Sequence, residues 1–177
     1  MKVKLTKKKI IFLIAAFIIL FQTVLARRVG EKESKIFSQQ KHLVKVVYVI
    51  DGDTIIVEGG KTVRYIGIDA PETNNPKKSV QCFGDEAFKK NRQLVGGKYI
   101  YMEKDISEVD RYGRLLRYIW LKEDQSTKKT TFINDYLVRQ GYAHAATFQP
   151  DVKYTQQFLH AESEARGNLR GLWKSCN

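Results

Sequence analysis

The chain has 177 residues, of which 43% are apolar and 28% are charged, and its formal net charge is +12. This composition excludes a largely disordered chain and leaves room for one folded domain with a short extension. Five lysines before residue 10 supply part of the charge, yet the rest of the chain remains basic. A basic body favours polyanionic partners, nucleic acid first, although a merely soluble basic surface has the same composition.

Residues 1–26 have the pattern of an export signal. Lysines precede an apolar run at residues 10–21, and residues 24–26 place small side chains where a signal peptidase cleaves. The apolar stretch at 10–26 also reaches the short end of what spans a membrane, so an uncleaved anchor remains a second interpretation. Both interpretations predict an extracytoplasmic protein, either secreted or attached to the membrane through residues 10–26.

The rest of the chain is expected to be a tether at 27–40 followed by one domain at 41–177. The tether is polar and mixed in charge, and no Gly/Ser-rich linker divides the domain after it. The two cysteines, Cys82 and Cys176, both belong to the exported part. An oxidising compartment permits a disulfide between them, and two free thiols are the alternative.

The pattern of apolar residues in the domain predicts five strands and three helices. Runs of β-branched and aromatic residues indicate strands, and apolar spacing that ends at glycine indicates helices. The expected strands cover residues 42–50, 54–58, 62–68, 98–103 and 115–121, and the expected helices cover 84–95, 132–140 and 151–166. This order favours an α+β fold that is mainly β, a five-stranded barrel of the OB type carrying three helices.

Two carboxylates suit a hard cation. Asp53 lies in the turn after the first expected strand, and Asp69 follows the third. A divalent cation can activate water and bind a phosphate oxygen, and oxygen ligands suit calcium or magnesium. Waters, a backbone carbonyl and the substrate phosphate would complete the coordination. The histidines are too scattered for a zinc site and are expected on the surface or in packing: His42, His144 and His160.

A base and two electrophiles complete the candidate site. Glu72 can accept a proton, and its alternative role is a capping acid after Pro71. Arg64 and Arg114 can each fork onto two phosphate oxygens and stabilise charge in a transition state. Either arginine alone could be an ordinary surface salt bridge. Together with the carboxylates, these groups favour hydrolysis of a phosphodiester bond.

Several motifs occur in one order along the chain. They are Asp51-Gly52-Asp53-Thr54, Arg64 with Asp69 and Pro71-Glu72-Thr73, Asn75-Pro76-Lys77-Lys78 with Phe83-Gly84, Tyr112-Gly113-Arg114, Leu137-Val138-Arg139-Gln140-Gly141, and Leu172-Trp173. With these motifs the chain resembles the staphylococcal nuclease family over roughly residues 43–173.

The resemblance implies an OB-type barrel and a calcium-dependent nuclease that acts on DNA and RNA and leaves 3′-phosphate ends. By position, one Ca²⁺ would be bound by Asp53, Asp69 and the carbonyl of Ala70. The catalytic residues would be Arg64, Glu72 and Arg114, and nucleotide contacts would come from Lys78 and Tyr112. We expect a monomer.

The chain departs from the family pattern at two positions. Ala70 replaces a common threonine, which leaves the carbonyl in place and removes a hydroxyl. Near residues 147–149 the nucleotide-facing tyrosines of the family are absent, and Phe148 can stack on a base without offering a hydroxyl.

Two other functions fit the composition. One is a non-catalytic OB-fold module that binds nucleic acid, and the other is an exported surface protein that binds other polyanions. The presence of the full catalytic set favours the enzyme. The sequence does not choose between DNA and RNA, nor between general-base and water-positioning roles for Glu72.

Overall fold

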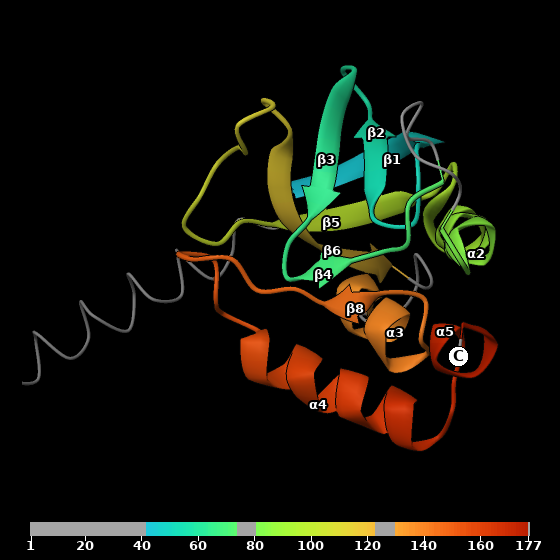
Figure 1. Cartoon of the computed structure of the whole chain (residues 1–177). Coiled ribbons are helices and arrows are strands. Elements are labelled where there is room, and N and C mark those ends of the chain that lie inside the picture. The colour runs from blue at the N-terminus through green and yellow to red at the C-terminus, as the bar shows by residue number, and fades with distance from the viewer. Residues whose placement is uncertain (1–41, 74–80, 123–129, 177) are drawn as a thin grey trace, which may run out of the picture. The chain divides into compact units, whose positions relative to one another are not determined.

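In the computed structural model, which describes residues 42–73, 81–122 and 130–176, five strands close into a barrel (Figure 1). The strands are β1 (His42–Val49), β2 (Thr54–Val57), β3 (Lys61–Tyr65), β5 (Tyr99–Glu103) and β6 (Leu115–Lys122). They pair antiparallel in the order β3-β2-β1-β5-β6, and a parallel pairing of β3 with β6 closes the ring. The predicted OB-type barrel is confirmed.

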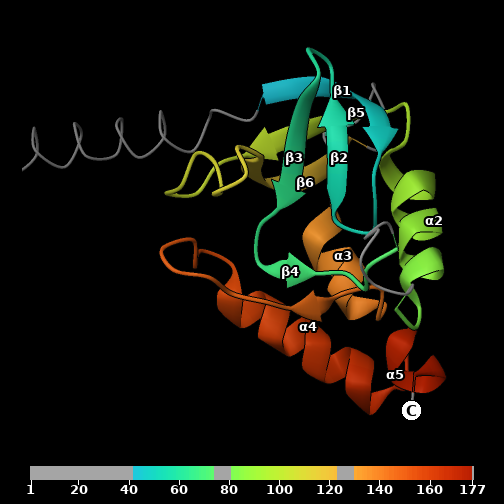
Figure 2. The same ribbon diagram turned by 45° about the horizontal axis from the view of Figure 1, so that its top comes forward.

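The helices lie outside the barrel. They are α2 (Gly84–Val95), α3 (Ile133–Arg139), α4 (Thr155–Gly167) and the short α5 (Leu172–Ser175). Both ribbon views place α2 along the side of the barrel and α3, α4 and α5 together at one end (Figures 1 and 2). The three longer helices confirm the sequence prediction, and α5 was not predicted.

Three very short strands complete the part of the chain that the structure describes. β7 (Thr130–Phe132) extends the sheet beyond β6, whereas β4 (Ile68–Asp69) and β8 (His144–Ala145) form a separate two-stranded sheet. No helix within the described ranges is both long and apolar enough to cross a membrane. The predictions for residues 1–26 and 27–40 lie outside the described residues.

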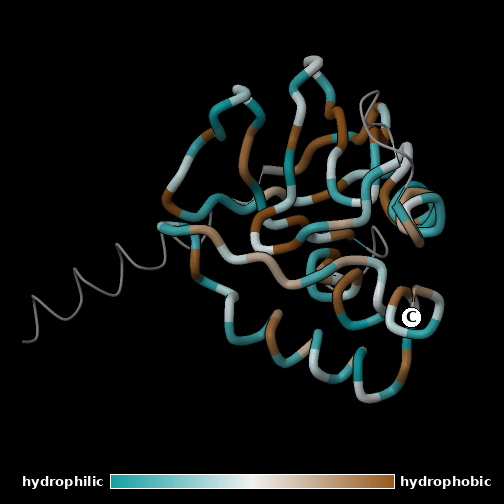
Figure 3. Tube along the Cα trace, viewed as in Figure 1, coloured by the Kyte–Doolittle hydropathy of each residue, from teal (hydrophilic) through white to brown (hydrophobic). Residues whose placement is uncertain are grey.

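Alternation along the strands builds the core. Strand side chains alternate between the two faces of a sheet, so every second residue can point into the barrel. Fully buried examples from the five barrel strands are Val46, Ile55, Val63, Ile100 and Ile119. Helix α4 buries one face, with apolar residues three or four positions apart: Phe158, Ala161 and Ala165. Its hydropathy alternates along the tube in Figure 3.

Two predicted boundaries differ from the structure by more than two residues. The third strand ends at Tyr65 instead of residue 68, because the chain turns at Gly67 with a φ of +78°. A Cβ at Gly67 would lie 2.4 Å from the Phe158 ring, so the turn requires glycine. The last long helix begins at Thr155 instead of residue 151.

Asp151 has a different task from starting that helix. Its carboxylate accepts hydrogen bonds from the backbone amides of Ile106 (2.9 Å) and Ser107 (2.8 Å). These donors lie more than forty positions away in the sequence, in the segment between β5 and β6. The contact therefore fastens that segment to the start of the helical end.

Two buried asparagines hold the turn between β1 and β2 and the turn that follows β3. Asn91 in α2 donates to the carbonyl of Asp51 (2.9 Å) and accepts from the hydroxyl of Tyr65 (3.0 Å). Asn134 in α3 donates to the carbonyl of Ile66 (2.8 Å). Because a buried amide without partners would be costly, these contacts fix the turns relative to the helices.

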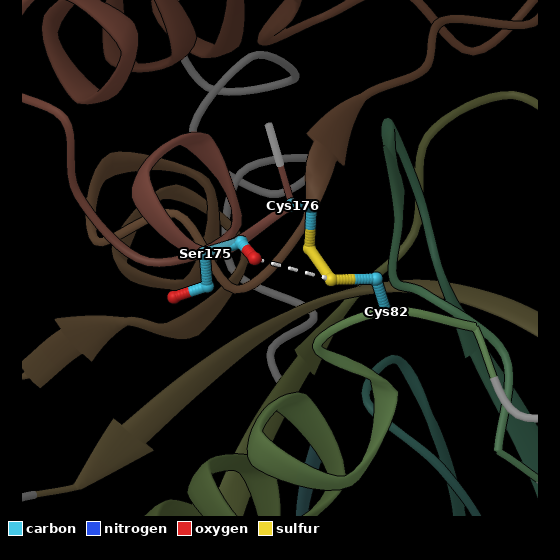
Figure 4. The surroundings of a disulfide bond; sticks show 3 residues. All are labelled: Cys82, Ser175 and Cys176. Atoms are coloured by element: carbon cyan, nitrogen blue, oxygen red, sulfur yellow. Dashed lines mark hydrogen bonds between the residues drawn. A yellow bond between two sulfur atoms is a disulfide. The ribbon is translucent and has the colours of Figure 1, made fainter.

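A disulfide joins Cys82, just before α2, to Cys176, just after α5 (Figure 4). The two Cα atoms are 5.8 Å apart, and the cysteines are 94 positions apart in the sequence. The sulfur of Cys82 also lies 3.6 Å from the carbonyl oxygen of Ser175, and as a disulfide sulfur it makes only a packing contact there. The chain-entropy model gives a loop of this length about 4–5 kcal/mol of stabilisation.

Candidate active site

Asp53 is the buried centre of the candidate site. Its side chain is 1% exposed, and its carboxylate accepts hydrogen bonds from the Thr54 hydroxyl (3.0 Å), the Ala70 amide (2.6 Å) and Arg64. Burial raises the pKa of Asp53 well above its ordinary value; the positive charge of Arg64 opposes this shift, and the negative charge of Asp51 adds to it.

Arg64 joins the buried carboxylate to an exposed one. One terminal nitrogen donates to Asp53, and the other donates to Asp69 at 2.5 Å. The side chain of Arg64 is 20% exposed and that of Asp69 is 61% exposed. Burial lowers the pKa of Arg64, but the two carboxylates outweigh burial and the net shift is upward. The guanidinium therefore remains charged at the boundary between core and solvent.

The β2–β3 hairpin explains why these side chains meet. Its register pairs Thr54 with Arg64, so the residue before Thr54 lies beside the arginine. Asp69 then arrives through the turn at Gly67. The structure therefore brings Asp53, Arg64 and Asp69 together.

The donor set around Arg64 fits a hard divalent cation. Arg64 contacts the carboxylates of Asp53 and Asp69, and Asp51, which accepts a hydrogen bond from the Asp53 amide (3.0 Å), adds a third negative charge in the neighbourhood. This leaves an excess of negative charge, presented by oxygen atoms. In the described part of the chain, no three His, Cys, Asp or Glu side chains are grouped closely enough to hold a metal alone. Waters, the Ala70 carbonyl and substrate oxygens would have to complete the coordination.

Arg114 is oriented by its own turn. The carboxylate of Asp110 accepts from Arg114 Nε (2.7 Å), from the Arg114 amide (3.0 Å) and from the Tyr112 amide (2.9 Å). Gly113 supplies the φ of +78° that the turn requires. Partial burial raises the pKa of Asp110, but these hydrogen bonds outweigh it and leave the pKa below its ordinary value.

A hollow of about 520 Å³ brings the two arginines to one surface. We call it the Tyr112 hollow, and the predicted residues that line it are Arg64, Asp69, Tyr112, Arg114 and Phe148. Tyr112 and Phe148 are largely exposed, and the Arg114 guanidinium lies 5.4 Å from the centre of the Tyr112 ring. Aromatic faces beside cations are suited to nucleobases next to phosphates.

Not every predicted residue lines this hollow. Asp53 lies buried below it, and Ala70 is adjacent through the hydrogen bond to Asp53. Glu72 is half-buried and is not among the lining residues. Lys78 lies outside the described residues.

Gln81 holds the backbone of Glu72 through two hydrogen bonds. The Glu72 amide donates to the Gln81 side-chain oxygen (2.8 Å), and the Gln81 amide donates to the Glu72 carbonyl (2.9 Å). Gly84 packs so closely that a Cβ there would lie 2.8 Å from the same carbonyl oxygen. The segment after Asp69 is therefore fixed against the start of α2.

Four residues around the site have contacts that the sequence does not reveal. Asp51 and Asp110 fall inside the motifs, but no role was assigned to them. Gln81 carries no local signal that would reveal its contact with Glu72. His144 was expected on the surface or in packing; its side chain is indeed 43% exposed and packs against Trp173, but its place opposite Asp69 in the β4–β8 pairing carried no signal.

Comparisons with known proteins agree with this geometry. Residues 62–175 match the family model described as "Staphylococcal nuclease homologue". The thermonuclease of Staphylococcus hyicus is 32% identical over 169 residues, which cover 94% of this chain and 96% of that protein. The thermonuclease of Staphylococcus intermedius is 32% identical over 174 residues (97% and 98%). Endonuclease YncB of Bacillus subtilis is 37% identical over 153 residues (83% and 68%).

Proposed function

This chain belongs to the staphylococcal nuclease family and is a nuclease, and we propose that it is an exported, calcium-dependent enzyme that cleaves DNA and RNA and leaves 3′-phosphate ends. The observation that carries the proposal is the position of Arg64. It bridges a buried and an exposed carboxylate at a hollow that Arg114 also lines.

The substrate phosphate is proposed to lie between the two arginines. A guanidinium can place two donors on two phosphate oxygens and remains charged at any working pH. The pentacoordinate transition state carries more negative charge than the phosphodiester, so donors held by Asp53, Asp69 and Asp110 stabilise it without being rearranged.

The acidic groups of the site have two proposed roles. Asp53, Asp69 and the Ala70 carbonyl would hold one Ca²⁺, which supplies activation of water and neutralisation of phosphate charge. Glu72 would take the proton of the attacking water or orient that water. Attack at phosphorus then breaks the bond to the 5′ oxygen, and the phosphate remains on the 3′ side.

A cleavage assay on purified residues 27–177 tests the proposal. We expect degradation of single-stranded DNA and of RNA with added calcium, no degradation with a chelator, and slower turnover with magnesium because of its stricter geometry. New 5′ ends should accept label from a polynucleotide kinase without prior dephosphorylation. Equal activity after exhaustive chelation would exclude the metal role. Binding without cleavage would favour the non-catalytic module.

Export is part of the proposal and rests on residues 1–26. The Cys82–Cys176 disulfide supports it, because such bonds persist in oxidising compartments. Fractionation with N-terminal sequencing distinguishes the two forms. A soluble protein that begins near residue 27 indicates cleavage, and an intact chain in the membrane pellet indicates an anchor. We propose that the active form is a monomer, which sedimentation can test.

A further inference from the structure

A second hollow lies next to the Tyr112 hollow, and Asp69 lines both. We call it the His144 hollow; it measures about 370 Å³, and its wall includes Pro71, His144, Trp173 and the Cys82–Cys176 disulfide. This volume falls within the range of about 300–1,000 Å³ that is common for ligand sites. The two hollows therefore meet at Asp69.

His144 is placed in this hollow by the short sheet. The β4–β8 register sets His144 directly opposite Asp69. Residues opposite each other in an antiparallel pair have Cβ atoms about 4.5–5.5 Å apart. The imidazole is 43% exposed, and its Nδ1 lies 3.5 Å from Glu162. Glu162 therefore orients the imidazole, and the ring is accessible from the hollow.

An aromatic residue and a cation support the imidazole. The Trp173 ring meets the His144 ring edge to face, with centroids 4.9 Å apart. The Arg166 guanidinium lies 4.1 Å from the centre of the Trp173 ring and 3.4 Å from Glu162. These contacts hold the His144 ring at the hollow, and a flat ring held in this way can accept a nucleobase by stacking.

A nuclease that cuts within a strand must accommodate nucleotides on both sides of the scissile phosphate. The Tyr112 hollow, with Tyr112 and Phe148, accounts for one side. We propose that the His144 hollow binds the nucleotide on the other side, with His144 stacking against its base. This inference rests on the proposed function, because it takes the scissile phosphate to lie between Arg64 and Arg114, next to Asp69.

The test uses dinucleotides that lack one base at a time. The substrates are the thymidine dinucleotide and its two versions in which one nucleoside is replaced by an abasic residue. The base proposed to lie in the His144 hollow is called the far-side base. On the substrates that carry it, we expect His144→Ala to lower kcat/KM about tenfold, mainly through KM, as the loss of one stacked base predicts. On the version without that base, His144→Ala should cause no comparable loss.

Phe148→Ala provides the crossed comparison, because it should show the same dependence on the opposite base. His160→Ala removes an exposed histidine of α4 and should leave kcat/KM unchanged on all three substrates. His144→Phe keeps a flat ring and should retain most of the binding. Thermal unfolding of each variant separates these effects from a loss of folding.

Two results would overturn the inference while leaving the enzyme intact. They are an effect of His144→Ala that follows the same base as Phe148→Ala, and an effect that follows neither base. Failure of the wild-type protein to cleave any strand, long or short, would instead refute the proposed function.

Discussion

Two aspartate–arginine pairs serve the candidate site from opposite settings. Asp53 and Arg64 come from the barrel wall, and the aspartate is 1% exposed. Asp110 and Arg114 share one turn, and their side chains are 17% and 30% exposed. Burial raises the pKa of Asp53, whereas hydrogen bonds lower the pKa of Asp110.

The difference shows that the same pair of residue types can contribute to stability and catalysis in one place and mainly to catalysis in another. Arg64 compensates a charge that the fold has buried, so it contributes to stability as well as to the proposed catalysis. Arg114 is paired in partial contact with solvent, where ion pairs contribute little to stability. Replacing each partner should therefore separate stability from turnover.

Removal of Arg64 should have the largest effect. We expect Arg64→Ala to lower turnover at least about 100-fold and to lower the free energy of unfolding by about 3–5 kcal/mol. Asp53 then stays buried without its cation, and its folded pKa lies above the unfolded value of about 3.9. The folded variant holds a proton that the unfolded chain releases, so its free energy of unfolding should fall as pH rises above about 4. The difference from the wild-type protein should widen once pH passes the folded pKa of Asp53 in the wild-type protein, which is itself raised. Urea denaturation at several pH values measures it.

Arg64→Lys is the matched control for that variant. It keeps a positive charge beside Asp53 and should keep most of the stability, but it cannot fork onto two phosphate oxygens. Turnover should still fall at least about 100-fold. Near-normal turnover in Arg64→Lys would show that the arginine is structural.

Arg114→Lys should affect turnover alone. We expect a loss of at least about 100-fold in turnover and less than about 1 kcal/mol in stability. Single-turnover kinetics and urea denaturation give the two quantities. A stability loss as large as that of Arg64→Ala would remove the distinction between the two pairs.

Asp110→Asn should have a smaller effect on turnover, about tenfold, because the amide keeps an acceptor for the backbone but loses the charge-assisted bond to Arg114. The effect should fall mainly on kcat. Glu108→Gln is the control, since Glu108 also pairs with an arginine, Arg117, which is not among the residues that line the Tyr112 hollow. Equal losses in both variants would point to a general effect on the segment between β5 and β6.

Acid should loosen the Asp110 turn only at low pH. The folded pKa of Asp110 lies below its ordinary value, so its stabilising contribution is complete above the unfolded pKa of about 3.9 and is lost as pH falls through the folded pKa. NMR titration of the Asp110 carboxyl and Arg114 Nε should show this. A midpoint at or above the ordinary value would contradict the hydrogen-bonded turn.

Much of this site could be predicted from the sequence, because several of its parts are formed by residues close together in the chain. Asp53 directly precedes β2 and Arg64 lies in β3 of the same hairpin, and the turn from Asp110 to Arg114 is a single motif. The pairing of short segments that are distant in the chain could not be predicted. β4 and β8 have two residues each, too few to show a period, so the position of His144 opposite Asp69 had no signal. The contact of Asp151 with the Ser107 amide likewise depends on tertiary structure.

The Cys82–Cys176 bond makes residues 82–176 a covalent ring. A protease that cuts once within this ring produces two fragments that remain attached to each other. Arg64, which precedes the ring, and Arg114, which lies within it, would then stay in one molecule. Nicked protein should keep its full mass on a non-reducing gel and separate into two bands only after reduction. Such an arrangement suits an enzyme proposed to work outside the cell, among other hydrolases.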